Sequence, residues 1–180
     1  MRIRRGRPED VEAIGALLAV YVEQGLLLPR TPEQIRRAIA DFQVALEGGA
    51  VVGCVALEFY GARRNGLAEI RSLAVTPGAR GAGLGRRLLE AAVKQAQRRG
   101  TARVFAVTRA AKFFERGGFS RVPGGMPAEK LARDCAVCPK AATCTLTALS
   151  RELAPAGAPQ LLPVFAPARH GGLRRSPAPA

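Results

Sequence analysis

The 180-residue chain has no tryptophan, aromatic residues make up 5% of it, and its single histidine, His170, lies near the end of the printed sequence. This position disfavours a relay that pairs a serine or cysteine with a histidine inside the core. The Gly-Lys-Ser/Thr sequence of Walker phosphate loops is also absent. No apolar run approaches the length of a membrane span, and the start MRIRRGRPED has no apolar secretion segment. We therefore expect a cytoplasmic protein without a membrane partner.

Acidic residues are scarce: 14 Asp and Glu stand against 28 Lys and Arg, which gives a formal net charge of +14. Such a charge permits nucleic acid, an acidic membrane surface or an anionic small molecule as partner. The arginines are scattered and aromatics are few, which disfavours a nucleic-acid surface. We expect one folded domain over residues 1–153. Residues 154–180, rich in Pro, Ala and Gly, are expected to form a disordered tail.

Hydrophobic periodicity predicts the element order β-α-α-β-β-β-α-β-α-β. Thr31, Pro32 and Gln34 form a capping-box pattern at the start of the second helix. The expected elements are a strand at 2–6, helices at 8–25 and 31–42, a hairpin at 42–60, a strand at 67–75, a long helix from 84 that Gly100 ends, a strand at 102–108, a helix at 110–119 and a strand at 145–153.

A turn of sequence RGAGLG, residues 80–85, connects the strand at 67–75 to the long helix. Glycines let successive backbone N–H groups point inward, and a helix N-terminus adds partial positive charge, so this turn favours phosphate. The dinucleotide fingerprint is excluded because counting from Gly81 puts Arg86, not glycine, at its last position. The alternative is that the glycines only shape a tight turn.

The pattern Arg/Gln-x-x-Gly-x-Gly/Ala, read here as RGAGLG after IRSLAVTP, resembles the GNAT family of N-acetyltransferases, and so does the element order over residues 1–153. The resemblance implies an α/β fold with a central, mixed, mostly antiparallel sheet flanked by helices, and acetyl-CoA as co-substrate. It implies that the pantetheine arm pairs with the backbone of Leu73, Ala74 and Val75. The implied pyrophosphate-binding stretch is Arg80, Gly81, Ala82, Gly83, Leu84, Gly85 and Arg86.

Several segments resemble the short, single-domain bacterial N-acetylglutamate synthases of arginine biosynthesis: GLLLPRT, VVGCVALEFY, LAEIRSLAV, FFERGGF and DCAVCPKAATC. This resemblance implies acetyl transfer to the α-amine of L-glutamate. Many GNAT members carry a tyrosine that protonates the departing thiolate, where FFERGGF has Phe114. Alternatives are a GNAT enzyme for another small amine or a protein N-terminus, and a non-catalytic module that senses CoA or binds nucleic acid.

The strand LAEIRSLAV carries the candidate chemistry. Side chains alternate along a strand, so Glu69, Arg71, Leu73 and Val75 should share one face unless a bulge intervenes. The acceptor amine must lose a proton before it attacks, and Glu69 is the candidate base. Arg71 should favour the charged form of Glu69, so a water relay is preferred to direct abstraction. A backbone N–H near Leu73 would stabilise the oxyanion. Alternatively, Glu69 and Arg71 form a structural ion pair.

A dicarboxylate acceptor needs planar cations that match its carboxylates. Arg30, in the loop between the first two helices, and Arg71 are the candidates, with Lys112 a weaker third. Each is alternatively a solvated surface charge.

Cys135, Cys138 and Cys144 form C-x-x-C-x5-C beside Asp134. Thiolates at this spacing can hold structural zinc, with Asp134 or a partner chain as fourth ligand, or they are reduced cysteines in a turn. Cys54 is expected to be buried in a core strand. No catalytic metal is predicted, and a homodimer is left open.

Overall fold

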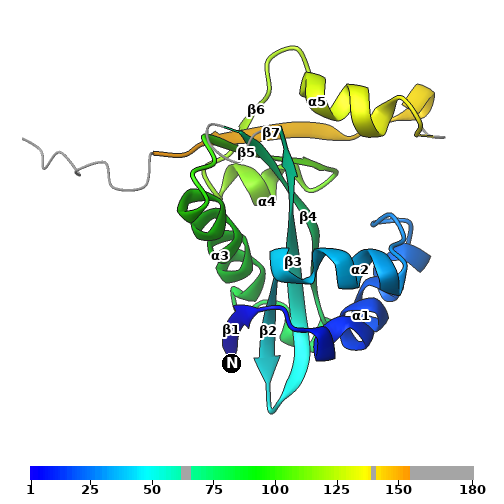
Figure 1. Ribbon diagram of the computed structural model, residues 1–180, viewed down its shortest axis with the longest axis vertical. Helices are drawn as coiled ribbons and strands as arrows, with labels where there is room; N and C mark the ends of the chain where they lie inside the picture. The colour runs from blue at the N-terminus through cyan, green and yellow to red at the C-terminus, as the bar shows by residue number, and fades with distance from the viewer. Residues whose placement is uncertain (62–65, 139–140, 155–180) are drawn as a thin grey trace, which may run out of the picture.

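The computed structural model describes residues 1–61, 66–138 and 141–154 (Figure 1). The predicted tail, apart from Ala154, and His170 lie outside the described residues. In the ranges above, no helix is both long and apolar enough to cross a bilayer.

Seven strands of the described residues form one mixed sheet at the centre of the fold, in the order β1-β2-β3-β4-β5-β7-β6. The β4–β5 pair is parallel and the other neighbouring pairs are antiparallel. The expected α/β fold with a mostly antiparallel sheet is therefore confirmed. The strands are β1 (Arg2–Arg5), β2 (Phe42–Glu47), β3 (Ala50–Tyr60), β4 (Leu67–Val75), β5 (Arg103–Thr108), β6 (Ser120–Arg121) and β7 (Thr147–Glu152).

Helices cover both faces of the sheet (Figure 1). On one face α3 (Leu84–Arg98) and α4 (Ala111–Glu115) pack with the larger hydrophobic cluster. On the other, α1 (Val11–Glu23) and α2 (Pro32–Ala38) pack over β2 and β3. Thr31 caps α2 as expected, because its Oγ1 accepts from the Gln34 backbone N–H and the Gln34 side chain accepts from the Thr31 N–H.

Several details differ from the expected elements, among them α4, which ends at Glu115 although a helix was expected to residue 119. The helix expected at 31–42 ends at Ala38, and the tighter turn Ile39–Asp41 follows it. The short strand β6 is additional. So is a helical segment made of α5 (Ala128–Lys130) and a wider, π-helical turn, η4 (Leu131–Cys135). We call residues 128–135 the cap segment. Polar contacts with β3 and β4, described below, hold the cap segment in place. The hydrophobic periodicity of a sequence does not indicate polar contacts of this kind.

A bulge in β4 changes which side chains share a face. Arg71 pairs with Ala56 and Ala74 with Cys54, so Ser72 and Leu73 together lie opposite a single β3 residue. Ser72 adopts the left-handed backbone conformation, with φ of 51°. A bulge of this kind shifts the alternation by one residue.

The bulge corrects the expectation that four β4 side chains share a face. Leu73 and Val75 pack against the cluster on the α3 side, as do Ala68 and Ile70. Glu69 and Arg71 alternate with the last two and so point to the opposite face. The side chains of Leu73 and Val75 therefore lie on the face opposite to Glu69 and Arg71, whereas Ala74 packs in the cluster on the α1 side.

The parallel strands β4 and β5 separate after a short contact. They pair only where Leu67–Glu69 meets Arg103–Phe105, although β4 continues to Val75 and β5 to Thr108. Beyond Glu69 the facing edges of the two strands are free to pair with a ligand.

Candidate active site

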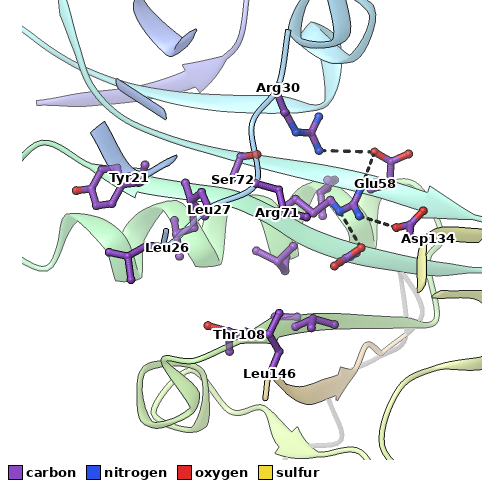
Figure 2. Close-up of a pocket in the computed structure, with 18 of the residues that line it drawn as sticks. Tyr21, Leu26, Leu27, Arg30, Glu58, Arg71, Ser72, Thr108, Asp134 and Leu146 are labelled. Carbon is purple, nitrogen blue, oxygen red and sulfur yellow. Dashed lines mark hydrogen bonds and ion pairs between the residues drawn. The ribbon is translucent and has the colours of Figure 1, made fainter. Parts of the chain in front are cut away.

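A cleft of about 1190 Å³ occupies the opening between β4 and β5. Residues 70–75 of β4 and 106–108 of β5 line it, together with the α1–α2 loop and the cap segment. Figure 2 shows Arg71 and Ser72 on one wall and Thr108 and Leu146 on the other, with Arg30 close to the Arg71 end. Apolar side chains line the cleft together with charged ones, among them Arg71 and Lys130 near Glu69 and Arg80 at the glycine turn.

A smaller pocket of about 370 Å³ lies at the glycine turn and shares Val75, Arg80, Gly85 and Phe113 with the cleft. Gly81 and Gly83 have positive φ values of 85° and 73°, conformations that favour glycine. The N-terminus of α3 has no side-chain cap, so its first amides remain available to an anion. Of the predicted pyrophosphate stretch, Arg80, Gly81, Gly83, Leu84, Gly85 and Arg86 line this pocket, while Ala82 is exposed in the same turn.

Tyr21 joins α1 to this end of the cleft. Its hydroxyl donates to the Val75 carbonyl and accepts from Arg80 Nη2 at 2.8 Å. The Arg80 guanidinium also lies 5.4 Å from the centre of the Tyr21 ring. The Arg80 side chain is thereby held beside the last residue of β4.

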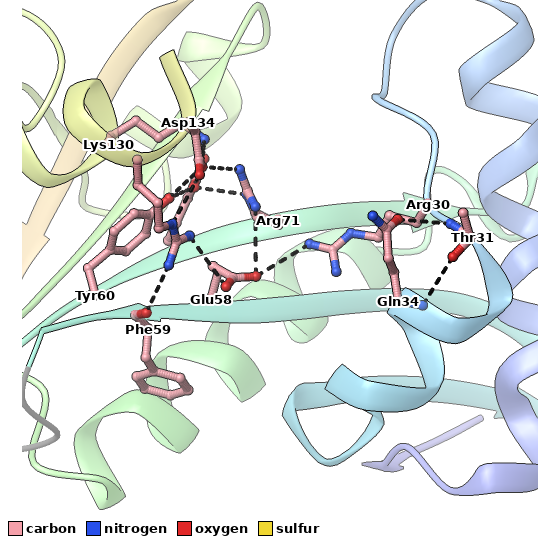
Figure 3. A network of polar contacts seen from close by, with 11 residues as sticks. Arg30, Thr31, Gln34, Glu58, Phe59, Tyr60, Arg71, Lys130 and Asp134 are labelled. Atoms are coloured by element: carbon pink, nitrogen blue, oxygen red, sulfur yellow. Dashed lines mark hydrogen bonds and ion pairs between the residues drawn. The ribbon is translucent and has the colours of Figure 1, made fainter. Parts of the chain in front are cut away.

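At the opposite end of the cleft, Glu69 is 3% exposed and takes part in a polar network with three donors. Figure 3 shows Tyr60, Arg71, Lys130 and Asp134 of this network. Its Oε2 atom accepts from Arg71 Nε and Lys130 Nζ, each at 2.9 Å, and from the Tyr60 hydroxyl at 2.7 Å. In the described ranges nothing donates to Oε1. Any further donor, such as an amine or a water molecule, would therefore meet Glu69 at Oε1.

Asp134 connects the cap segment to the same network. Its Oδ2 accepts from Lys130, one helical turn away, and from Arg71. Burial alone would raise the pKa of Asp134, but hydrogen bonds from Lys130, Arg133 and Tyr60 outweigh it and hold the pKa well below its usual range.

Tyr60 lies between the Glu69 and Asp134 carboxylates, at 2.7 and 2.8 Å. Burial, followed by the contact with Glu69, raises the pKa of Tyr60 above its usual range, so the hydroxyl stays protonated. With one proton it donates to one carboxylate at a time.

Arg30 reaches this end of the cleft from the α1–α2 loop. Its Nη2 lies 3.8 Å from Glu58 Oε2, and Arg71 Nη1 lies 3.7 Å from the same oxygen. Burial lowers the pKa of Arg30, and the charge of Arg71 lowers it further. The structure therefore brings together the two arginines that the sequence singled out.

The family of the chain is settled by comparison with known proteins. The model of the acetyltransferase (GNAT) family matches residues 15–119. The chain belongs to the GNAT acetyltransferase family. It is an acetyl-CoA-dependent N-acetyltransferase, as expected from RGAGLG and the strand before it.

Individual relatives agree with this membership. An uncharacterised N-acetyltransferase of Chlorobaculum tepidum is 38% identical over 151 residues, which cover 84% of this chain and 96% of that protein. An amino-acid acetyltransferase of Neisseria meningitidis is 36% identical over 118 residues, 65% of this chain. The N-acetylglutamate synthase of Neisseria gonorrhoeae, solved with coenzyme A and N-acetyl-glutamate, has a TM-score of 0.75 and 28% identity over 85% of this chain. The chain spans only 27% and 35% of these two Neisseria proteins.

Lys112 and Phe114, which the sequence analysis also considered, are placed differently from Arg30 and Arg71 in this GNAT chain. Lys112 is exposed on α4 and is not among the residues that line the cleft. Phe114 does line the cleft, but its ring is 6% exposed and packs edge-on against Phe113 and Phe119. The cleft wall at Phe114 therefore supplies no hydroxyl to a departing thiolate.

The zinc site considered for the cysteines is not supported by the described residues of this GNAT structure. Cys135, Cys138 and Cys144 line the cleft, yet in the part of the chain that the structure describes no three His, Cys, Asp or Glu side chains converge as metal ligands. Asp134, the candidate fourth ligand, accepts hydrogen bonds from Tyr60, Arg71 and Lys130 in the polar network. Cys54 is buried as expected, and burial raises the pKa of its thiol to about 12.

The end of the cleft that contains Glu69 and Arg71 is called the acceptor end below. Sequence analysis did not identify four further residues there: Glu58, Tyr60, Lys130 and Arg133. A glutamate inside the apolar run VVGCVALEFY is a local signal for Glu58. Lys130 and Arg133 carry no such signal, because their partners are about 60 to 75 residues away in sequence.

Proposed function

We propose that the chain transfers the acetyl group of acetyl-CoA to the α-amine of L-glutamate and so forms N-acetylglutamate, the reaction of the short synthases of arginine biosynthesis. The observation that carries the proposal is the convergence of Arg30 and Arg71 at the end of a cleft that begins at the glycine turn. Guanidinium groups match carboxylates in shape and charge. The names of the Neisseria relatives support the same class of acceptor.

The charge balance of the acceptor end supports an anionic acceptor. Four cations face three carboxylates there, which leaves a formal charge of +1. A polyamine or other cationic amine would meet a net repulsion, whereas glutamate, with one net negative charge, would neutralise it. The cations are Arg30, Arg71, Lys130 and Arg133, and the carboxylates are Glu58, Glu69 and Asp134.

On the donor side, we infer that acetyl-CoA enters between β4 and β5. The pantetheine arm would pair with the backbone of Leu73, Ala74 and Val75, where the strands have separated. The pyrophosphate would take the amides of the turn at 81–86, beside Arg80 and Arg86. This path puts the thioester near the bulge and next to the Glu69–Arg71 pair.

The proposed reaction is a direct attack. A water molecule takes a proton from the ammonium group and passes one to the Glu69 carboxylate, and the neutral amine then adds to the thioester carbonyl. The N–H of Leu73 stabilises the oxyanion of the tetrahedral intermediate. The intermediate collapses by breaking the C–S bond, and the second amine proton passes through water to the CoA thiolate, since Phe114 has no proton to give.

The experiment that tests this function measures thiol release from acetyl-CoA with a panel of amines: glutamate, aspartate, glutamine, a polyamine and a peptide with a free N-terminus. We expect glutamate to give the highest kcat/KM. Turnover of another amine in preference to glutamate would contradict the acceptor assignment. Absence of turnover with every amine, in protein that binds CoA, would favour a CoA-binding module without catalysis.

A further inference from the structure

Glu58 lies between three guanidinium groups at the acceptor end (Figure 3). Its Oε2 atom is 3.8 Å from Arg30 Nη2 and 3.7 Å from Arg71 Nη1. Its Oε1 atom is 3.3 Å from Arg133 Nη2. On the neighbouring strand its register partner is Glu69, so two carboxylates lie side by side across β3 and β4.

The contacts of Glu58 are looser than those of the other carboxylates. Glu69 accepts three hydrogen bonds of 2.7 to 2.9 Å and its side chain is 4% exposed. The Glu58 side chain is 31% exposed, and its two Oε2 contacts are longer than hydrogen bonds. An entering anion would therefore displace Glu58 more easily than Glu69.

Within the described part of the chain, Arg30 and Arg71 each have a donor whose ion-pair partner is Glu58. Arg71 uses Nε for Glu69 and Nη2 for Asp134, which leaves Nη1 directed at Glu58. Arg30, whose side chain is 14% exposed, has Glu58 as its ion-pair partner among residues 1–61, 66–138 and 141–154. The space that Glu58 Oε2 occupies is thus the space where a bound carboxylate would reach both guanidinium groups.

We propose that Glu58 is an internal competitor for the acceptor's carboxylate and thereby sets the affinity for the acceptor. In the free protein Oε2 of Glu58 neutralises Arg30 and Arg71. When the acceptor enters, its carboxylate takes the contacts with both arginines, and Arg133 retains Glu58 through Oε1. This inference rests on the proposed function in that it takes the acceptor to carry a carboxylate.

The test compares the affinity for glutarate of the full-length wild-type protein and Glu58→Gln, both saturated with CoA, by nuclear magnetic resonance titration. Glutarate carries the two carboxylates of glutamate but no amine, so it binds without reacting. Removal of a competing ion pair that is partly exposed should tighten glutarate binding about fivefold. A merely structural role of Glu58 would predict weaker binding, because loss of its charge would loosen the arginines.

Two controls accompany this titration. Glu47→Gln, at the exposed end of β2, changes the net charge equally but lies away from the cleft, and it should leave glutarate binding unchanged. Glutaramide, the uncharged analogue of glutarate, should not bind more tightly to Glu58→Gln. If Glu58→Gln does not fold, Glu58→Asp, which withdraws the carboxylate by one methylene, should give a smaller increase in affinity.

Unchanged or weaker glutarate binding in a folded Glu58 variant overturns the inference. So does an equal gain in Glu47→Gln, because that result would report net charge alone. Failure of the proposed function is a separate result: wild-type protein that does not acetylate glutamate refutes the acceptor assignment, whereas the comparison of glutarate affinities needs no turnover.

Discussion

Replacement of Gly83 tests whether the glycine turn binds the pyrophosphate of acetyl-CoA. Gly83 has φ of 73°, and a Cβ atom added there would meet no atom within 4 Å. Gly83→Ala and Gly83→Asp therefore fit sterically, and both carry a backbone cost of about 1–2 kcal/mol, somewhat less for aspartate. The two variants differ chiefly in a carboxylate at a residue that lines the same pocket as Arg80, Arg86 and Arg116.

The expected loss of acetyl-CoA affinity follows from the repulsion between the aspartate carboxylate and the phosphate charges. Even with full solvent screening, a carboxylate about 4 Å from a phosphate charge costs about 1 kcal/mol, so two phosphate charges cost about 2 kcal/mol. Relative to Gly83→Ala, Gly83→Asp should thus weaken acetyl-CoA binding about 30-fold in calorimetry. The KM for the acceptor should be similar in the two variants. Affinities for acetyl-CoA within about threefold of each other would refute the pyrophosphate assignment.

Three further predictions concern the acceptor end. Arg30→Ala should raise the KM for glutamate about tenfold, with the KM for acetyl-CoA unchanged, because it removes a charge-assisted contact; equal KM values for glutamate would contradict this role. Lys130→Met should lower the unfolding free energy by about 2 kcal/mol and Tm by about 5 °C, since Glu69 and Asp134 lose a buried partner; an unchanged melting curve would count against it. The pKa of Asp134 is lowered on folding, so its stabilisation is present above the usual value of 3.8 and is lost as the pH falls below it. In urea titrations the stability difference between wild type and Asp134→Asn should shrink below about pH 4, and a constant difference would refute this linkage.

Local patterns predicted the secondary-structure elements of the proposed donor half. The glycine turn, the strand before it and the long helix after it are contiguous in sequence, so spacing alone indicates them. The capping box at Thr31 was equally local, and the structure confirms both of its hydrogen bonds. Arg30 was a candidate because a dicarboxylate acceptor needs guanidinium groups, and this arginine lies in the loop between the first two helices.

The acceptor half depends on contacts between distant segments. The bulge at Ser72 arises from the register between β3 and β4, and a serine there gives no sign of a left-handed backbone. It moves the side chains of Leu73 and Val75 to the face opposite Glu69. Lys130 meets Glu69 across 61 residues of sequence, so no periodicity within the cap segment could have predicted the contact.

The acetylated product tests the central claim most directly. Purified protein is incubated with glutamate and acetyl-CoA labelled with ¹³C in the acetyl group, and the product is identified by mass spectrometry for wild type and Arg30→Ala. The account predicts labelled N-acetylglutamate from wild type, and far less from Arg30→Ala when glutamate is below its KM. Absence of labelled N-acetylglutamate from folded wild-type protein that binds acetyl-CoA would contradict it.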